Sequence, residues 1–175
     1  GLGELARRVK RMGLSFGLWF EPECVNEDSD LFRAHPGYAL VTPGKAPTLG
    51  RNQRVLDLTN PAVRDYIVDS VGAVLDSAPM DYVKWDMNRH ISDAFAPGLN
   101  RQGEFFHRYI LGLYEVLERI FGSRPHILLE SCSSGGNRFD LGMLCFSPQI
   151  WASDNTDPVI RQRIQGGLSL LYPLS

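Results

Sequence analysis

Two hydrophobic periodicities alternate along the chain, and together they predict a series of helices and strands. Apolar residues three and four positions apart predict amphipathic helices, whereas short, nearly continuous apolar runs predict buried strands. The predicted helices are 2–12, a segment from 61, 103–121 and a segment from 158, and the predicted strands are 14–20, 81–86, 126–130 and 149–153. On the third helix, the expected buried stripe consists of Phe106, Ile110, Leu113, Leu117 and Ile120.

The segment 24–53 interrupts this alternation. It is rich in Gly, Pro, Asn and Asp, with a short helix predicted after Ser29, and a brief strand is predicted directly after it over 54–58. Connections of this length are usually functional. Asn60 then caps the next helix and Pro61 occupies its first position, which is a strong start signal.

Strands that alternate with helices predict a parallel sheet with right-handed crossovers. Such a sheet is either open and doubly wound or part of a (β/α)8 barrel, which needs about 250 residues when complete. The glycine-rich phosphate loop of a nucleotide-binding sheet is missing, because Trp-Phe-Glu-Pro-Glu follows the first strand. Barrels instead collect their chemistry at the carboxyl ends of several strands. We therefore predict an α/β fold that is a partial (β/α)8 TIM barrel, with strand-end acids at Glu21, Glu23, Asp86, Glu130 and Asp154.

The composition is that of a folded chain. Its 175 residues are 43% hydrophobic with a formal net charge of −2, which argues against disorder and against a surface for nucleic acid or an anionic membrane. No apolar run approaches the ~18–20 residues of a membrane helix. The three cysteines fit neither a disulfide framework nor a zinc site, and we expect no metal and no cofactor. Because the chain begins at Gly1 without a methionine, we expect it to be a piece of a larger protein.

Lys84, Asp86 and Asn88 share one side of the predicted strand over 81–86, because side chains alternate along a strand. A lysine two residues before an aspartate is expected to lower the pKa of the aspartate and keep it ionised, as a nucleophile requires. The alternative is a Lys84–Asp86 ion pair with no role beyond satisfying its own charges, which is the commoner case on a strand of unknown function.

Asp154 is the second candidate carboxylate. Ser, Asp and Asn ahead of a proline are typical of helix caps, but Asp157 directly precedes Pro158 and is expected to be the cap, which leaves Asp154 without a structural duty. Two carboxylates on separate strand ends suit the cleavage of a glycosidic bond. Trp19 and Trp151 beside them are placed either to stack on a sugar ring or to fill the core. Arg89, Arg138 and Arg161 are expected to make structural ion pairs.

Five sequence strings carry a resemblance to a known family. They are GLWFEPE (17–23), GRNQRVLDLTNP (50–61), DYVKWDMNRH (81–90), ESCSSGGNRFD (130–140) and WASDNTDPVIRQRIQ (151–165). In this order they closely resemble the retaining α-galactosidases of glycoside hydrolase family 36, the melibiase type. The resemblance implies a (β/α)8 catalytic barrel, of which this chain covers roughly strands 3 to 6 with their helices.

The resemblance also implies roles for individual residues. Asp86 is the expected nucleophile and Asp154 the expected general acid/base. Asp154 must start protonated, and we expect burial and the charge of Asp86 to keep it so. Sugar contacts are implied for Trp19, Arg51, Lys84, Asn88, Cys132, Gly135 and Trp151.

Parts of the family pattern are missing. Its Asp-Asp-Gly-Trp motif, its N-terminal β-sandwich and its C-terminal domain are not in this sequence, so 1–175 is expected to be a fragment of a single catalytic barrel domain. HPGYAL (35–40) stands where the family usually has an Asp-Trp pair, and Ser134 and Asn137 stand where glycines are common.

The function implied is the hydrolysis of terminal α-galactosidic bonds in melibiose- and raffinose-type oligosaccharides, through a covalent galactosyl–Asp86 intermediate. A retaining mechanism needs the two carboxyl groups about 5–5.5 Å apart. A galactosyl transferase with the same carboxylates, or a non-catalytic carbohydrate-binding fragment, remains an alternative, and the isolated fragment is expected to be inactive. The expected partner is an α-galactoside oligosaccharide. The full-length protein is expected to be a homo-oligomer in a bacterial cytoplasm.

Overall fold

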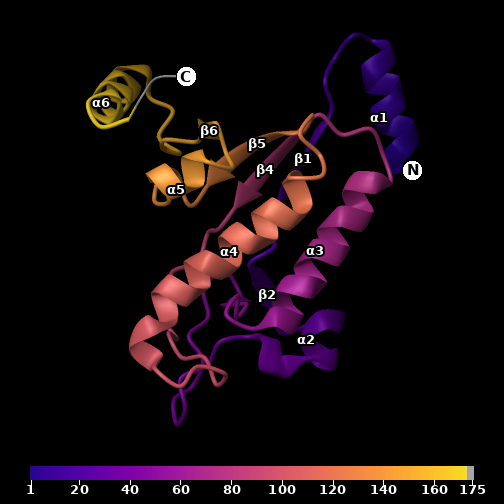
Figure 1. The fold of residues 1–175 in the computed structure, drawn as a ribbon. Helices are drawn as coiled ribbons and strands as arrows, with labels where there is room; N and C mark the ends of the chain where they lie inside the picture. The colour runs from indigo at the N-terminus through magenta and orange to yellow at the C-terminus, as the bar shows by residue number, and fades with distance from the viewer. Residues whose placement is uncertain (173–175) are drawn as a thin grey trace.

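The computed structural model describes residues 1–172 and shows an α/β fold (Figure 1). Four parallel strands form one sheet in the order β1-β4-β5-β6. Their bounds are Gly17–Phe20 for β1, Tyr82–Asp86 for β4, Leu128–Cys132 for β5 and Gln149–Ile150 for β6. The parallel sheet expected from the sequence is confirmed, with helices between consecutive strands as crossovers require.

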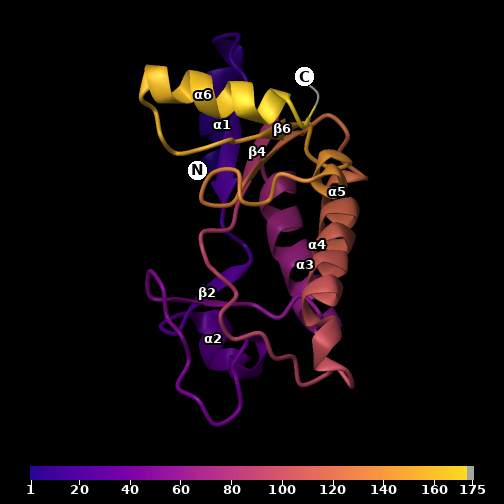
Figure 2. The ribbon, with the colours of Figure 1, turned by 90° about the vertical axis from the view of Figure 1, so that its left-hand side faces the viewer.

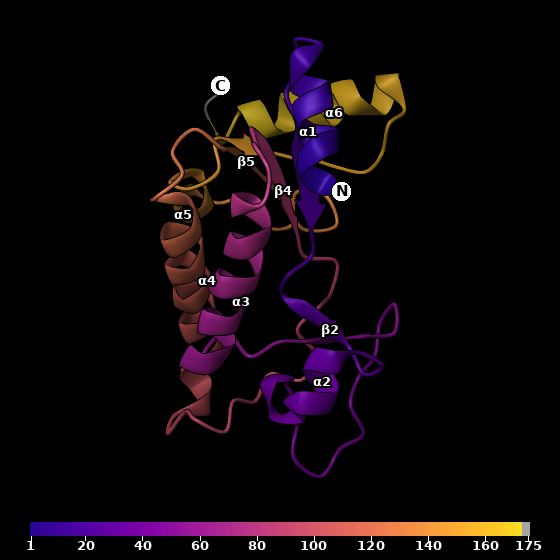
Figure 3. The same ribbon diagram turned by 90° about the vertical axis from the view of Figure 1, so that its right-hand side faces the viewer.

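The helices differ in length and position. The long ones are α1 (Leu2–Arg11), α3 (Pro61–Asp76), α4 (Phe105–Phe121) and α6 (Pro158–Ser169), and the short ones are α2 (Asp30–Ala34), α5 (Leu141–Leu144) and the 3-10 helices η1 (Pro36–Tyr38) and η2 (Gln102–Glu104). Helices α3 and α4 lie side by side against one face of the sheet, and α6 runs across the same end of the molecule as α1 (Figures 2 and 3). Among the described residues, none of the helices has the length and apolar character needed to cross a membrane.

Local sequence signals explain where the helices begin. The Asn60 side chain accepts a hydrogen bond from the backbone N–H of Ala62 at the start of α3, and Pro61 takes the first position. The Asp157 side chain likewise accepts from the N–H groups of Val159 and Ile160 at the start of α6. Asp157 is therefore the cap of this helix, as predicted, and Asp154 is not used for capping.

Three predictions from apolar patterning are wrong in detail. The first strand begins at Gly17, so Leu14 lies outside it and is exposed. The side chains of β1 alternate between exposed and half-buried, because β1 lies at the edge of the sheet. On α4 the buried face contains Phe105 and Tyr109, whereas Phe106 is 58% exposed. The last strand has two residues, and Trp151 follows it.

The long segment after β1 contains a strand that the sequence did not reveal. Cys24–Asn26 forms β2, and it pairs antiparallel with β3, which is Gln53–Val55 in the region of the brief strand predicted over 54–58. Ser29 caps α2, as expected, by accepting a hydrogen bond from the N–H of Phe32. This small β2–β3 ribbon and α2 lie beyond the carboxyl end of the sheet (Figures 1 and 3).

A buried carboxylate ties the sheet, α4 and the loop after β5 together. Glu23 is fully buried and accepts hydrogen bonds from Trp85 Nε1 at 2.8 Å and Tyr109 Oη at 2.9 Å. Arg138 adds a two-pronged ion pair, with Nη1 at 2.7 Å and Nη2 at 3.0 Å from the two oxygens of Glu23. Burial disfavours the guanidinium charge, but the charge and hydrogen bonds of Glu23 outweigh it, so the pKa of Arg138 is raised. The ion pair expected for Arg138 is confirmed.

Removal of Arg138 would leave the Glu23 charge buried without its counter-ion. We expect Arg138→Met to lower the free energy of unfolding by about 3–5 kcal/mol, because the desolvation cost of the carboxylate remains while its partner is lost. Urea denaturation followed by tryptophan fluorescence measures this change. Arg33→Met is the control, since within residues 1–172 Arg33 pairs only with the exposed Asp28 and Asp30, and its loss should be undetectable. Equal stability of the two variants would contradict the prediction.

Candidate active site

Most of the candidate residues lie at the carboxyl ends of neighbouring strands. Asp86 ends β4 directly beside Cys132, which ends β5, and Trp19 on β1 lies beside Lys84 on β4. Trp19 Nε1 donates a hydrogen bond to Asp86 Oδ2 at 3.0 Å. The sheet therefore brings together residues that are up to 113 positions apart in the sequence, counted from Trp19 to Cys132.

Asp86 is held in its ionised form. Its side chain is 6% exposed, and this burial raises the pKa of the carboxyl group. The nearby side chains of Asn88, Trp19 and Cys132 and the backbone N–H of Met87 outweigh the burial, and the net effect is a pKa below the usual value. Oδ1 of Asp86 accepts no hydrogen bond from any described residue.

Lys84 does not play the part that the sequence suggested. Its Nζ pairs with Glu130 Oε1 on β5 at 2.9 Å, directly across the sheet, and not with Asp86. Burial opposes the charge of Lys84, but the hydrogen bond and charge of Glu130 outweigh it and raise the pKa of Lys84. Tyr82 Oη also donates to Glu130. The expected low pKa of Asp86 is present, but the groups that lower it most are hydrogen-bond donors and not the lysine.

Asp154 lies in the loop after β6 and is exposed. The prediction that it is buried is wrong for the described chain. Trp151 Nε1 donates a hydrogen bond to Asp154 Oδ1 at 2.7 Å, and the Trp151 ring lies 4.8 Å from Lys84 Nζ. Lys84 therefore connects the strand that ends in Asp86 to the loop that carries Asp154.

Glu21 orients two of the residues implied as sugar contacts. Its carboxylate accepts hydrogen bonds from Arg51 Nη1 and Asn88 Nδ2, both at 2.8 Å, and from Gln53 Nε2 at 3.0 Å. Arg51 has a φ of 53°, in the left-handed region where a residue with a side chain is strained. Sequence spacing did not indicate this role, because the donors to Glu21 come from two segments, 51–53 and the loop after β4, that lie far from it in the sequence.

The glycine-rich loop after β5 packs against the segment that leads to Asp154. A Cβ at Gly135, which has a φ of +87°, would lie 3.0 Å from the Cα of Ser153, and one at Gly136 would lie 2.8 Å from the carbonyl oxygen of Ala152. Ser134 donates to Asn88 Oδ1 through its backbone N–H and through its hydroxyl. The loops after β4, β5 and β6 are therefore in direct contact.

Two of the expected structural ion pairs are absent among residues 1–172. Arg89 Nη2 donates to the carbonyl oxygen of Thr48 at 2.7 Å, and Arg161 Nη1 donates to the carbonyl oxygen of Ser153 at 2.6 Å. Arg161 also places its guanidinium carbon 4.7 Å from the centre of the Trp151 ring. Both arginines fix loop backbone at this end of the sheet, with a carbonyl oxygen as partner instead of a carboxylate.

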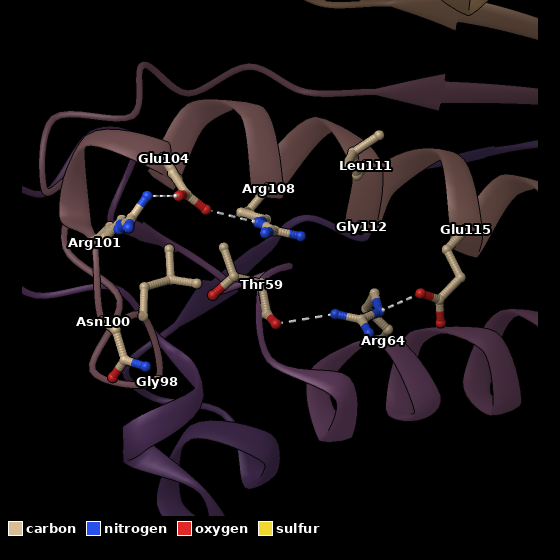
Figure 4. A pocket seen from close by; sticks show the side chains of 11 residues that line it. Thr59, Arg64, Gly98, Asn100, Arg101, Glu104, Arg108, Leu111, Gly112 and Glu115 are labelled. Carbon is tan, nitrogen blue, oxygen red and sulfur yellow. Dashed lines mark hydrogen bonds and ion pairs between the residues drawn. The ribbon is translucent and has the colours of Figure 1, made fainter.

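A separate polar cavity of about 590 Å³ lies between α3 and α4, away from these residues (Figure 4). Its charges are paired with one another, since Arg64 Nε lies 3.0 Å from Glu115 and Arg108 Nε lies 3.1 Å from Glu104. None of the candidate site residues lines it. Within the described part of the chain, no group of three or more His, Cys, Asp or Glu side chains is arranged to hold a metal ion.

The sequence matches a family profile over its whole length. The profile described as Melibiase covers residues 1–175. The chain belongs to the melibiase family. Among curated proteins, this melibiase-family chain is 53% identical to Alpha-galactosidase 1 of Pediococcus pentosaceus and 53% identical to Alpha-galactosidase AgaA of Geobacillus stearothermophilus, each over 177 residues that include all of this chain. It spans 24% of the length of either relative, which is about a quarter.

Solved structures give the same relation. The glycoside hydrolase family 36 α-galactosidase AgaA of Geobacillus stearothermophilus superposes with a TM-score of 0.95 at 52% identity, covering 100% of this chain and 25% of that one. The galactosidase domain of the α-galactosidase–sucrose kinase AgaSK superposes with a TM-score of 0.93 at 51% identity, over 100% of this chain and 24% of that one. Variants of AgaA have been solved in complex with stachyose and with raffinose.

The three cysteines should differ in reactivity. Burial raises the pKa of Cys132 to about 11, with further contributions from Asp86, and burial with the charges of Glu23 and Glu21 raises the pKa of Cys24 to about 12. Cys145 is exposed. Because the thiolate is the reactive form, we expect iodoacetamide at pH 8 to alkylate Cys145 well before the other two.

Peptide mapping by mass spectrometry measures the extent of labelling at each cysteine. Labelling in guanidinium chloride is the control, since all three thiols should then react at similar rates. Fast labelling of Cys132 in the native protein would show that its thiol is accessible and contradict the burial described above.

Proposed function

We propose that this chain is the part of a retaining α-galactosidase that carries both catalytic carboxylates. The chain then forms roughly strands 3 to 6 of a (β/α)8 barrel, and a longer protein supplies the remaining strands and further domains. The family membership, the four parallel strands and the quarter-length match to the relatives support this proposal. The position of the polar residues at the carboxyl ends of the strands is typical of barrel enzymes.

The observation on which the proposal rests most is the state of Asp86. A nucleophilic carboxylate must be ionised at neutral pH and must keep one oxygen free to attack. Asp86 has a lowered pKa, one oxygen held by Trp19 and the other without a hydrogen bond among the described residues. A carboxylate with a purely structural role is normally satisfied at both oxygens, as Glu23 is.

The proposed reaction has two steps. In the first, an oxygen of Asp86 attacks the anomeric carbon of the galactosyl unit while Asp154 donates a proton to the departing glycosidic oxygen. In the second, Asp154 takes a proton from water, and the water oxygen displaces Asp86 from the anomeric carbon. Two inversions at that carbon restore the α configuration, so galactose is released with retention.

The surrounding residues are placed to assist these steps. Lys84 lies on the same side of β4 as Asp86, and its ion pair with Glu130 keeps the ammonium group charged and in place. Arg51 and Asn88, both held by Glu21, present donors to hydroxyl groups of the sugar. Trp19, 51% exposed and bonded to Asp86, offers an aromatic surface for a sugar ring. Because AgaA variants were solved with stachyose and raffinose, we propose the same class of α-galactoside oligosaccharide as substrate.

The nucleophile can be identified by trapping. In the enzyme that contains this chain, a fluorinated galactosyl fluoride forms the intermediate faster than water can release it, and we expect the peptide with Asp86 to gain the mass of one fluorogalactosyl unit. Asp86→Asn should show no such gain and should lose at least ~10³-fold in kcat/KM for p-nitrophenyl α-galactoside, because the covalent route is closed. Asp81→Asn is the matched control, because Asp81 directly precedes β4, at the opposite end of the strand from Asp86, and pairs with Lys10. Labelling of another residue would contradict the assignment.

The isolated 175 residues are expected to be inactive. Asp154 and Trp19 are exposed in the described chain, so water has free access to the groups that a glycosidase must shield. We expect no release of p-nitrophenol from p-nitrophenyl α-galactoside above background by this chain alone, while the whole enzyme is active in the same assay. Hydrolysis by the isolated chain would show that the missing segments are not needed for catalysis.

A further inference from the structure

One helix residue contacts both structural elements that hold Asp154. Arg161 lies in the first turn of α6, where its backbone N–H donates to the carbonyl oxygen of Asp157 at 2.8 Å. Its side chain leaves the helix and donates to the carbonyl oxygen of Ser153 at 2.6 Å, which belongs to the peptide bond that joins Ser153 to Asp154. The peptide that positions Asp154 is therefore tied to a rigid helix by a charged donor.

The same guanidinium contacts the aromatic ring that holds the carboxylate. The Arg161 guanidinium carbon lies 4.7 Å from the centre of the Trp151 ring, and the Trp151 indole N–H donates to Asp154 Oδ1 at 2.7 Å. A cation within about 6 Å of a ring centre is attracted to the ring. Lys84 makes the second such contact at 4.8 Å, and Glu130 holds Lys84 in place. Trp151 is thus fixed by two cations that come from different elements.

This arrangement is not what helix packing alone requires. Arg161 is half-buried, whereas its neighbours Gln162 and Arg163 are exposed, and Arg161 has no carboxylate partner among the described residues. The Arg161 side chain contacts one aromatic ring and one carbonyl group instead of a carboxylate. We therefore interpret its role as holding these two groups in position. Both lead directly to Asp154.

We propose that Arg161 is a positioning residue for the general acid/base of the galactosidase reaction. It holds the Trp151 indole and the Ser153–Asp154 peptide so that the Asp154 carboxyl group reaches the glycosidic oxygen. Arg161 itself contacts neither the sugar nor the reacting atoms. This inference rests on the function proposed above and adds to it the residue that aims the proton donor.

Leaving-group dependence separates this role from a general structural one. Methyl α-galactoside needs a proton on its departing oxygen, whereas p-nitrophenol leaves as its anion with little help from an acid. In the whole enzyme, we expect Arg161→Ala to lower kcat/KM for methyl α-galactoside by at least ~10-fold, within the ~10²–10⁴-fold that general acid catalysis contributes. The same variant should lose less than about threefold with p-nitrophenyl α-galactoside.

Arg163→Ala is the matched control, because Arg163 lies on the same helix, is exposed, and makes no side-chain hydrogen bond or ion pair within residues 1–172. It should behave as the unsubstituted enzyme does with both substrates. Arg161→Lys keeps a cation near Trp151 but loses the planar fork, so its selective loss should be intermediate. This variant also carries the test if Arg161→Ala fails to fold, which thermal unfolding reveals.

The outcomes are distinguishable. An equal loss with both substrates, or no loss relative to Arg163→Ala, would overturn the positioning role of Arg161. A lack of activity of the unsubstituted enzyme on p-nitrophenyl α-galactoside would instead overturn the proposed function.

Discussion

A single buried negative charge, the carboxylate of Glu23, organises this end of the molecule. A carboxylate without solvent is costly unless all of its lone pairs are used, and Glu23 receives donors from β4, from α4 and from the loop after β5. One residue from each element, Trp85, Tyr109 and Arg138, reaches the same carboxylate. Glu23 therefore fixes the position of the strand ends relative to α4.

The catalytic candidates depend on that placement. Trp85 and Asp86 are consecutive residues of β4, so their side chains point to opposite sides of the strand. When Glu23 holds the indole of Trp85 on the helix side, Asp86 must face the side where Trp19 and Lys84 lie. The buried network on the helix side of the sheet thus fixes the orientation of the Asp86 carboxylate on the other side, although no side chain of the network donates a hydrogen bond to Asp86 among the described residues.

Local sequence signals predicted the local parts of this structure. The caps at Asn60 and Asp157, the parallel strands and the position of Asp86 at a strand end all follow from patterns within a few residues. The partners that decide the electrostatics come from distant segments and leave no local signal. The sequence placed Lys84 two residues from Asp86 and suggested an interaction between them, but Lys84 forms its ion pair with Glu130 on the neighbouring strand β5. On α4, Phe105 is buried in place of Phe106 because packing against the rest of the fold sets the rotation of the helix about its axis. Hydrophobic periodicity alone does not determine this rotation to within one residue.

Gly135 and Gly136 pack closely on residues 152–153, so the loop after β5 lies directly against the backbone that leads to Asp154. A side chain at either position would push the two segments apart, because its Cβ would lie 3.0 Å or less from backbone atoms of 152–153. In a glycosidase, a gap of a few ångströms between the two carboxyl groups decides whether a water molecule fits between nucleophile and sugar. In the reaction proposed above, the absence of a side chain at Gly135 and Gly136 therefore contributes to the spacing on which retention of configuration depends.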